Sequence, residues 1–117
     1  MPSPISIISG IVLGLSSAEV YRFAGNDPKV RQIVITSMGF VNNDSVARKV
    51  TVYVIPDKGA ASFATTKILA MSIPSSTGGG APTFIVMDET LLPGHSIQAF
   101  ADTAAVVAFR ANGTAYP

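Results

Sequence analysis

Alternation of side chains over two neighbouring runs is the feature that most constrains this sequence. In the second run, three valines fall on one side of an extended chain: Val50, Val52 and Val54. The residues between them fall on the other side: Thr51, Tyr53 and Ile55. In the first run Met38 and Phe40 share a face, which Ile33 and Ile35 continue if a bulge falls near Thr36-Ser37. Successive side chains of a strand point to opposite faces, so both runs are predicted as strands with one buried face.

A polar break separates these two runs at Asn42-Asn43-Asp44-Ser45. Asn and Asp tolerate left-handed backbone angles and bond their own backbone, which suits a tight connection. The stretch from Ile33 to Pro56 is therefore predicted as a central hairpin, with Phe40 and Val52 pointing inward.

The rest of the chain adds short strands between turn signals. A last hairpin is predicted from Ser96–Ala101 and Ala105–Ala111, with the ordered pattern ending at Asn112-Gly113. The segment from Ser75 to Pro82 is predicted as a mobile hairpin tip, because no Lys-Ser/Thr pair follows its glycines as a phosphate loop requires. About eight strands without a helix predict an all-β fold, an antiparallel β-sandwich of the jelly-roll type, forming a single domain over residues 1–117.

The N-terminal residues 1–16 are predicted as a strand or arm with two apolar faces. One face carries five aliphatic residues: Ile5, Ile7, Ile11, Leu13 and Leu15. Ile8 and Val12 fall on the opposite face among serines and glycines. Either another segment of the chain or a partner must cover this second face, because an uncovered apolar strand promotes aggregation. We expect the strand to be the docking element, with Ile8 and Val12 as partner-contact candidates.

Composition restricts the classes of partner. Apolar residues make up 48% of the chain and charged residues 13%, against about 25% charged in typical domains. Some apolar surface could then face another protein, or the sandwich could be coated with Ser, Thr and Ala. The net charge is +1 with scattered basic residues, so no nucleic-acid partner is expected. The N-terminal apolar run is too short to span a bilayer, so no membrane partner is expected either.

Catalytic and metal-binding constellations are absent from the sequence. There is no cysteine, which removes disulfides, thiolate zinc sites and Cys nucleophiles. His95 is the only histidine and is read as a solvent-exposed turn residue, since no partner for catalysis or metal binding has a suitable spacing. Asp88 and Glu89 are adjacent on a strand and cannot face one another across a sugar. We therefore expect a non-enzymatic protein with no catalytic residue, no cofactor and no metal.

Two aromatic residues remain as contact candidates. Tyr53 and Phe100 are predicted to face outward. They could form a weak platform for a sugar ring, or the centre of a subunit contact, where aromatic residues are enriched.

Several stretches of the chain resemble small β-sandwich virion proteins of tailed bacteriophages. The matching stretches are Val20–Gly25, Phe40–Asn42, Thr51–Pro56, Leu91–Ala101 and Val106–Phe109. The resemblance covers about Val20 to Ala111 and leaves the N-terminal strand outside. His95 departs from the pattern, because Asp is common at that position in the family.

This resemblance implies a structural role without catalytic residues. It implies a capsid decoration or cement protein on the outer capsid surface of a virion, assembled in the host cytoplasm. Such a protein would act as a homo-oligomer and bridge subunits of the major capsid protein or another virion protein. A tail, fibre or baseplate component is the alternative within this class. A carbohydrate-binding module is the alternative from another class.

Overall fold

The computed structural model describes residues 2–56, 66–77 and 82–117. These residues form eight strands: β1 Ser3–Val12, β2 Ala18–Arg22, β3 Gln32–Asn42, β4 Arg48–Ile55, β5 Lys67–Ile73, β6 Thr83–Leu91, β7 Ser96–Ala101 and β8 Val107–Tyr116. No α-helix, and hence no membrane-spanning helix, is found among the described residues. The sequence also predicts a turn at Pro56–Gly59 and a loose connection over Ala60–Thr65. Residues 57–65 lie outside the described residues, and so do the three glycines of the Ser75–Pro82 segment.

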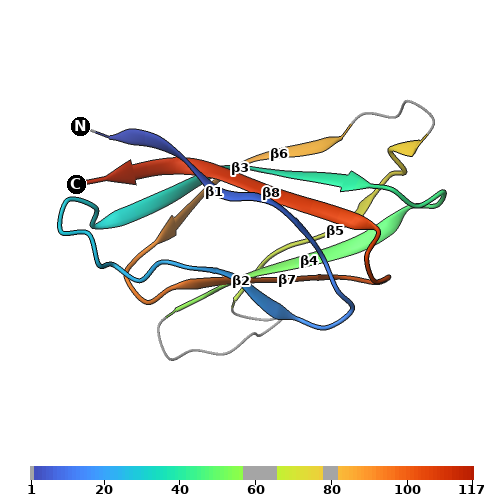
Figure 1. Cartoon of the computed structure of the whole chain (residues 1–117), viewed down its shortest axis with the longest axis horizontal. Helices are drawn as coiled ribbons and strands as arrows, with labels where there is room; N and C mark the ends of the chain where they lie inside the picture. The colour runs from blue at the N-terminus through green and yellow to red at the C-terminus, as the bar shows by residue number, and fades with distance from the viewer. Residues whose placement is uncertain (1, 57–65, 78–81) are drawn as a thin grey trace.

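Two four-stranded antiparallel sheets face each other (Figure 1). Sheet A has the order β1-β8-β3-β6, and sheet B has the order β2-β7-β4-β5. The pairs β1–β8, β2–β7, β3–β6 and β4–β5 are nested, as if one long hairpin had been wound up. The contacts β3–β8 and β4–β7 then complete the two sheets. This arrangement is a jelly roll, so the predicted all-β sandwich of about eight strands is confirmed.

The two predicted hairpins are wrong. β3 and β4 lie in different sheets, and so do β7 and β8. The connection between β3 and β4 is residues 43–47. Five extended residues reach about 16 Å, which exceeds the roughly 10 Å between packed sheets. A turn sequence of this length therefore fits a crossing between sheets as well as a hairpin.

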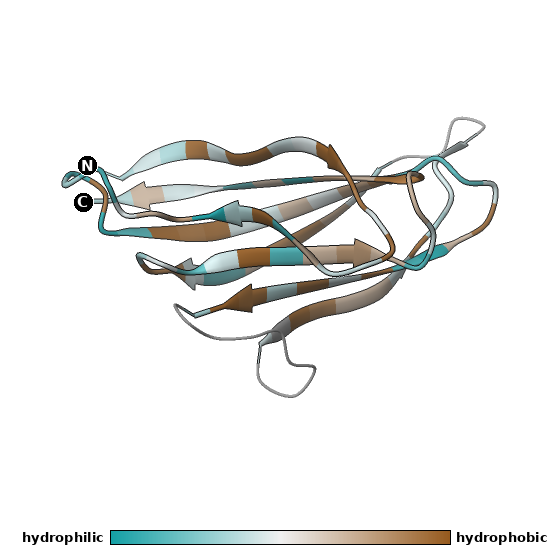
Figure 2. Cartoon of the chain, turned by 60° about the horizontal axis from the view of Figure 1, so that its bottom comes forward, coloured by the Kyte–Doolittle hydropathy of each residue, from teal (hydrophilic) through white to brown (hydrophobic). Residues whose placement is uncertain are grey.

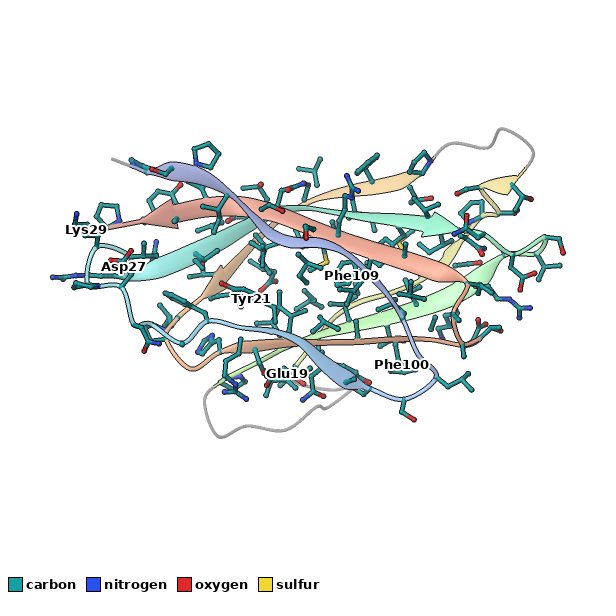
Figure 3. All side chains as sticks on the ribbon, in the orientation of Figure 1. Glu19, Tyr21, Asp27, Lys29, Phe100 and Phe109 are labelled. Carbon is teal, nitrogen blue, oxygen red and sulfur yellow. The ribbon has the colours of Figure 1, made fainter. Side chains whose placement is uncertain are left out.

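The core lies between the inner faces of the two sheets, and its centre is an aromatic stack. The rings of Phe40 on β3 and Phe109 on β8 are 5.0 Å apart between centroids, with planes 6° apart. Phe109 points into the space between the sheets, and Phe100 lies on the outer side of β7 (Figure 3). Apolar and polar bands alternate along the strands (Figure 2). The inward placement of Phe40 and Val52 is confirmed, since both are 0% exposed.

Bulges decide which residues of β3 and β1 face inward. The register shifts between Ile35 and Ser37, so the predicted bulge near Thr36-Ser37 is confirmed. β1 has two shifts against β8, between Ser6 and Ile8 and between Ile8 and Ile11. An extra residue reverses the side to which the following residues point. Ile8 consequently lies in the core and is 4% exposed, so its predicted outward placement is wrong.

The C-terminal strand extends further than the sequence indicated. β8 continues through Asn112 and Gly113 to Tyr116 and pairs on both sides, with β1 and with β3. The prediction that ordered structure ends at Asn112-Gly113 is therefore wrong. Gly113 is buried, and a Cβ at this position would meet the Val34 carbonyl oxygen. Glycine is required here by close packing, not by a turn.

A buried asparagine joins the two sheets at one end of the sandwich. Asn42 is 0% exposed, and its Nδ2 donates to the carbonyl oxygens of Val46 and Ile73, each at 2.9 Å. Its Oδ1 accepts from the backbone N–H of Asp44 at 2.9 Å. Asp44 in turn accepts from Arg48 Nε at 2.7 Å. This network fixes the crossing from β3 to β4 against the end of β5.

The aromatic stack gives the first testable prediction. Phe40→Ala should lower the free energy of unfolding by about 3 to 5 kcal/mol, because it removes a fully buried ring and leaves a cavity. Phe84→Ala is the matched control, since Phe84 is 62% exposed and should cost less than about 1 kcal/mol. Chemical denaturation of both variants measures the difference. Equal losses would contradict the assigned register.

The buried Asn42 gives the second testable prediction. Asn42→Ala should cost about 2 to 4 kcal/mol, because two carbonyl oxygens lose their donor. Asn43→Ala is the neighbouring control, and its exposed side chain should contribute less than about 0.5 kcal/mol. Thermal or urea unfolding is the measurement. A tolerated Asn42→Ala would show that Asn42 does not hold this end of the sandwich together.

Candidate interaction surface

The outer face of sheet A is divided into an apolar half and a polar half. Strand register places three residues in one row across β1, β8 and β3: Val12, Ala108 and Val41. Phe84 and Val86 on β6 point to the same side. Exposure is 61% for Val12, 62% for Phe84 and 89% for Val86. We call these five residues, with Pro82, the sheet A patch.

Beyond the patch, towards the chain termini, the same face is more polar. Its exposed or half-buried polar residues are Gln32, Thr36, Asp88, Thr90, Asn112 and Thr114. The strongly exposed apolar residues are therefore gathered at one end of the face, while Val34 and Tyr116 at the other end are half-buried. Large apolar side chains that cluster in this way are typical of a contact surface.

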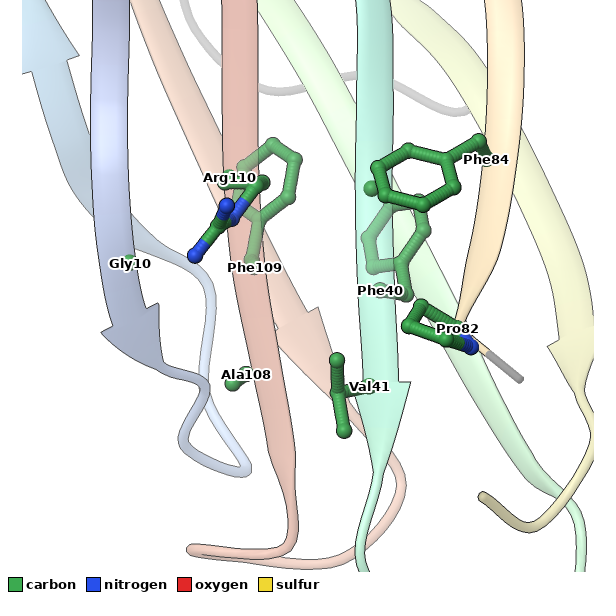
Figure 4. A pocket seen from close by; sticks show the side chains of 9 residues that line it. Gly10, Phe40, Val41, Pro82, Phe84, Ala108, Phe109 and Arg110 are labelled. Atoms are coloured by element: carbon green, nitrogen blue, oxygen red, sulfur yellow. The ribbon is translucent and has the colours of Figure 1, made fainter. Parts of the chain in front are cut away.

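A hollow of about 190 Å³ lies within the patch (Figure 4). It is lined by Gly10 of β1, Ala108 and Arg110 of β8, Gly39 and Val41 of β3, and Pro82 and Phe84 beside or on β6. The ring of Phe84 lies over β3, where a Cβ on Gly39 would come within 2.6 Å of it. Glycine at position 39 thus lets an aromatic ring from the edge strand rest on the sheet.

Arg110 is the charged residue of the hollow. Its guanidinium extends from β8 towards Gly10 of β1 (Figure 4). It forms no ion pair with any residue that the structure describes. An exposed cation beside apolar groups can bind an aromatic ring or an acidic group.

The outer face of sheet B offers less exposed apolar surface. Tyr53 lies on the outward side, as predicted, but is only 6% exposed. Its ring stacks with that of Phe100, with centroids 6.4 Å apart, and Phe100 is half-buried. Tyr53 therefore has no free ring face for a sugar. Of the four contact candidates, only Val12 is strongly exposed, and it lies in the sheet A patch.

The polar residues considered for chemistry are not brought together. Asp88 is exposed on the outer side of β6, while Glu89 pairs with the buried Ile35 on the inner side. His95 is half-buried rather than solvent-exposed, and its Nδ1 is buried without a hydrogen-bond partner. Within residues 2–56, 66–77 and 82–117, no group of three or more His, Asp or Glu side chains could hold a metal ion.

Sequence reasoning missed Phe84, Val86 and Arg110 as surface residues. A signal was present in Thr83–Met87, where both alternating faces are apolar: Phe84 and Val86 on one, Ile85 and Met87 on the other. In a two-layer sandwich only one face of each strand packs against the core, so a strand that is apolar on both faces exposes one apolar face to solvent. The glycine opposite Phe84 could not be paired with it from sequence alone.

Comparisons with known proteins concern the fold. No protein-family model matches the chain, and no curated protein matches it in sequence. A chain of the Bacillus endospore appendages, described as disulfide-linked pili, is similar with a TM-score of 0.51 and 10% identity, over 99% of this chain and 86% of that chain. At this identity the similarity supports the jelly-roll fold.

Two virus structures are similar at lower TM-scores. One is the virus-like particle of the extra small virus of the prawn Macrobrachium rosenbergii, at 0.45 and 15% identity, over 99% of this chain and 80% of that chain. The other is infectious bursal disease virus strain Gx, at 0.36 and 12% identity, where this chain covers 32% of the matched chain. The structural neighbours thus come from a pilus and from viruses.

Two glycines test the geometry of the patch. Gly39→Ala should change the free energy of unfolding by less than about 1 kcal/mol, because the exposed ring of Phe84 can move aside. Gly113→Ala should cost at least about 1 to 3 kcal/mol, because its Cβ would meet backbone. Urea unfolding of the two variants provides the comparison. A larger loss for Gly39→Ala than for Gly113→Ala would contradict the described packing.

Proposed function

We propose that this chain is a non-enzymatic structural protein of a virion, which decorates the outer capsid surface and bridges neighbouring subunits of the major capsid protein. The observation that carries the proposal is the sheet A patch, which is an exposed apolar surface. The described residues of the sandwich contain no group of His, Asp and Glu side chains that could hold a metal ion. Jelly rolls recur in viral capsid proteins. The motifs shared with small tailed-phage virion proteins add to this support.

The protein would hold to the shell through weak contacts that each copy of the sheet A patch makes with the capsid. One patch of this size contributes modest affinity, but many copies on one shell act together through multivalency. Apolar contacts are less sensitive to salt than surface ion pairs, which salt screens. The sequence contains no cysteine, so this chain forms no disulfide with a neighbouring subunit. Such a protein would be produced in the host cytoplasm and bind the shell there.

A tail, fibre or baseplate component is the second candidate, because the same patch could join subunits along a tube or fibre. The appendage-like fold is compatible with a fibrous assembly, although a disulfide link is unavailable to this chain. A carbohydrate-binding module is less well supported, since Tyr53 is buried and Phe100 is half-buried.

Localisation on the particle tests the proposal. An antibody raised against the purified chain should label the shell of phage particles produced from the genome that encodes it, viewed by immunogold electron microscopy. Particles from a genome with the gene deleted are the control and should carry no label. Label on the tail would select the second candidate, and purified particles without label would contradict both.

A further inference from the structure

We propose that the sheet A patch binds a second copy of this chain, face to face, about a two-fold axis that runs along β3. The inference rests on the geometry of the face and does not depend on the proposed role in a virion. It names the residues that meet: Phe84 of each copy enters the hollow of the other copy beside Arg110.

Strand register makes the face self-complementary. Gly39 on β3 pairs with Phe84 of β6 on one side and with Arg110 of β8 on the other. These three residues therefore form one row, with β3 in the middle. A two-fold axis above β3, parallel to the strands, exchanges β6 and β8 and so places Phe84 of one copy opposite Arg110 of the other. Two-fold interfaces use the same patch on both copies in this way.

The hollow is large enough to receive a ring. A cavity of about 150 Å³ holds benzene, and the hollow measures about 190 Å³. The space above Gly10 is open, because a Cβ there would meet no atom within 4 Å. Phe84 of the second copy would fill the space between Gly10 and Arg110, which the first copy leaves empty.

Charge also favours this arrangement. Arg110 has no ion pair among the described residues and lies in an apolar hollow. Placing the ring of Phe84 against its guanidinium forms a favourable cation–π contact. The two Arg110 side chains would start two strand spacings apart on sheets that lie about 10 Å from each other, so about 14 Å separates them and their repulsion is weak at ordinary salt.

The area fits a weak, reversible dimer. With the axis above β3, three strands of each copy overlap, namely β8, β3 and β6. Three strands of about ten residues present a face of about 14 by 33 Å, or about 470 Å² per copy. Two such faces bury about 900 Å² in total, which is below the range for tight interfaces and typical of a transient one. Packed sheets keep their strand directions within about 30° of each other, which an axis along β3 satisfies.

The edges of sheet A are less suited to a contact than its face. β1 carries Pro4 and two bulges. β6 carries Asp88 and the half-buried, inward-pointing Glu89. Proline, bulges and inward charges are features that prevent strand addition at an edge. The face is the part of the sheet that remains open to a second copy.

Sedimentation velocity over a concentration series of the full chain tests the proposal. The wild-type chain should dimerise reversibly. Phe84→Ser should raise the dissociation constant at least about a hundredfold, because two rings are lost per dimer. Arg110→Gln should raise it by about tenfold. Both residues are exposed, so circular dichroism spectra should be unchanged.

Two controls remove exposed apolar residues outside the patch. Val46 is 51% exposed in the β3–β4 connection, and Leu92 is 46% exposed after β6. Val46→Ser and Leu92→Ser should leave the dissociation constant unchanged within about twofold. A monomeric wild-type chain up to millimolar concentration would overturn the proposal and leave the patch for a different protein. Equal weakening by Phe84→Ser and Val46→Ser would also overturn it.

Cross-linking tests the axis itself. The chain has no cysteine, so Val41→Cys introduces a single thiol on the strand that lies along the axis. A short bismaleimide should join two copies of this variant, and should not join copies of Val46→Cys. The reverse pattern would contradict the axis. Because these measurements use the purified chain alone, their failure is separate from a failure to label particles.

Discussion

The pairing of β3 with β8 determines both the interior and the surface of this protein. Ten residue pairs join the two strands, and Phe40 faces Phe109 across them. Because side chains alternate, the neighbours of these rings must lie on the opposite side of the sheet. The residues there are small or apolar for the most part, with Gly39, Val41 and Ala108 next to the stack. The hollow is thus the reverse side of the aromatic stack.

The jelly-roll winding places the other elements around this pair. β1 and β6 pair with β8 and β3 and form the edges of sheet A, which bring Gly10 and Phe84 to the two sides of the hollow. Asn42 ends β3 and holds the crossing to sheet B through buried hydrogen bonds. The sandwich therefore holds the strands of sheet A, and with them its outer face, in a fixed arrangement. A preorganised surface loses less conformational entropy when it binds.

Local patterns in the sequence predicted well where strands form, but predicted poorly which strands pair with each other. Alternation and turn signals predicted about eight strands and the bulge of β3, because alternation reflects one buried face. It carries no information on which strand lies alongside, so β3 and β4 were paired in a hairpin although they face each other across the core. The outward placement of Ile8 is wrong because the bulge between Ser6 and Ile8 reverses the side to which Ile8 points.

Propensity and exposure explain the remaining differences between sequence and structure. Asparagine is common in turns, yet the side-chain amide of Asn42 is buried and links the two sheets. Phe84 and Val86 belong to a strand with two apolar faces, and only the filled core shows which face is left outside. Tyr53 lies on the outward side but is buried, which alternation alone does not reveal. Val12 is exposed on the outer face of sheet A, and its role as a partner contact stays a prediction.

Hydroxyl-radical footprinting across a dilution series of the purified chain tests most directly whether the sheet A patch is an assembly surface. Side-chain oxidation reports solvent access, and Phe and Leu both react. Oxidation of Phe84 should fall as the protein concentration rises, while oxidation of Leu92, which is exposed outside the patch, should stay constant. Constant oxidation of Phe84 over a range in which the protein associates would contradict the account, because association would then use another surface.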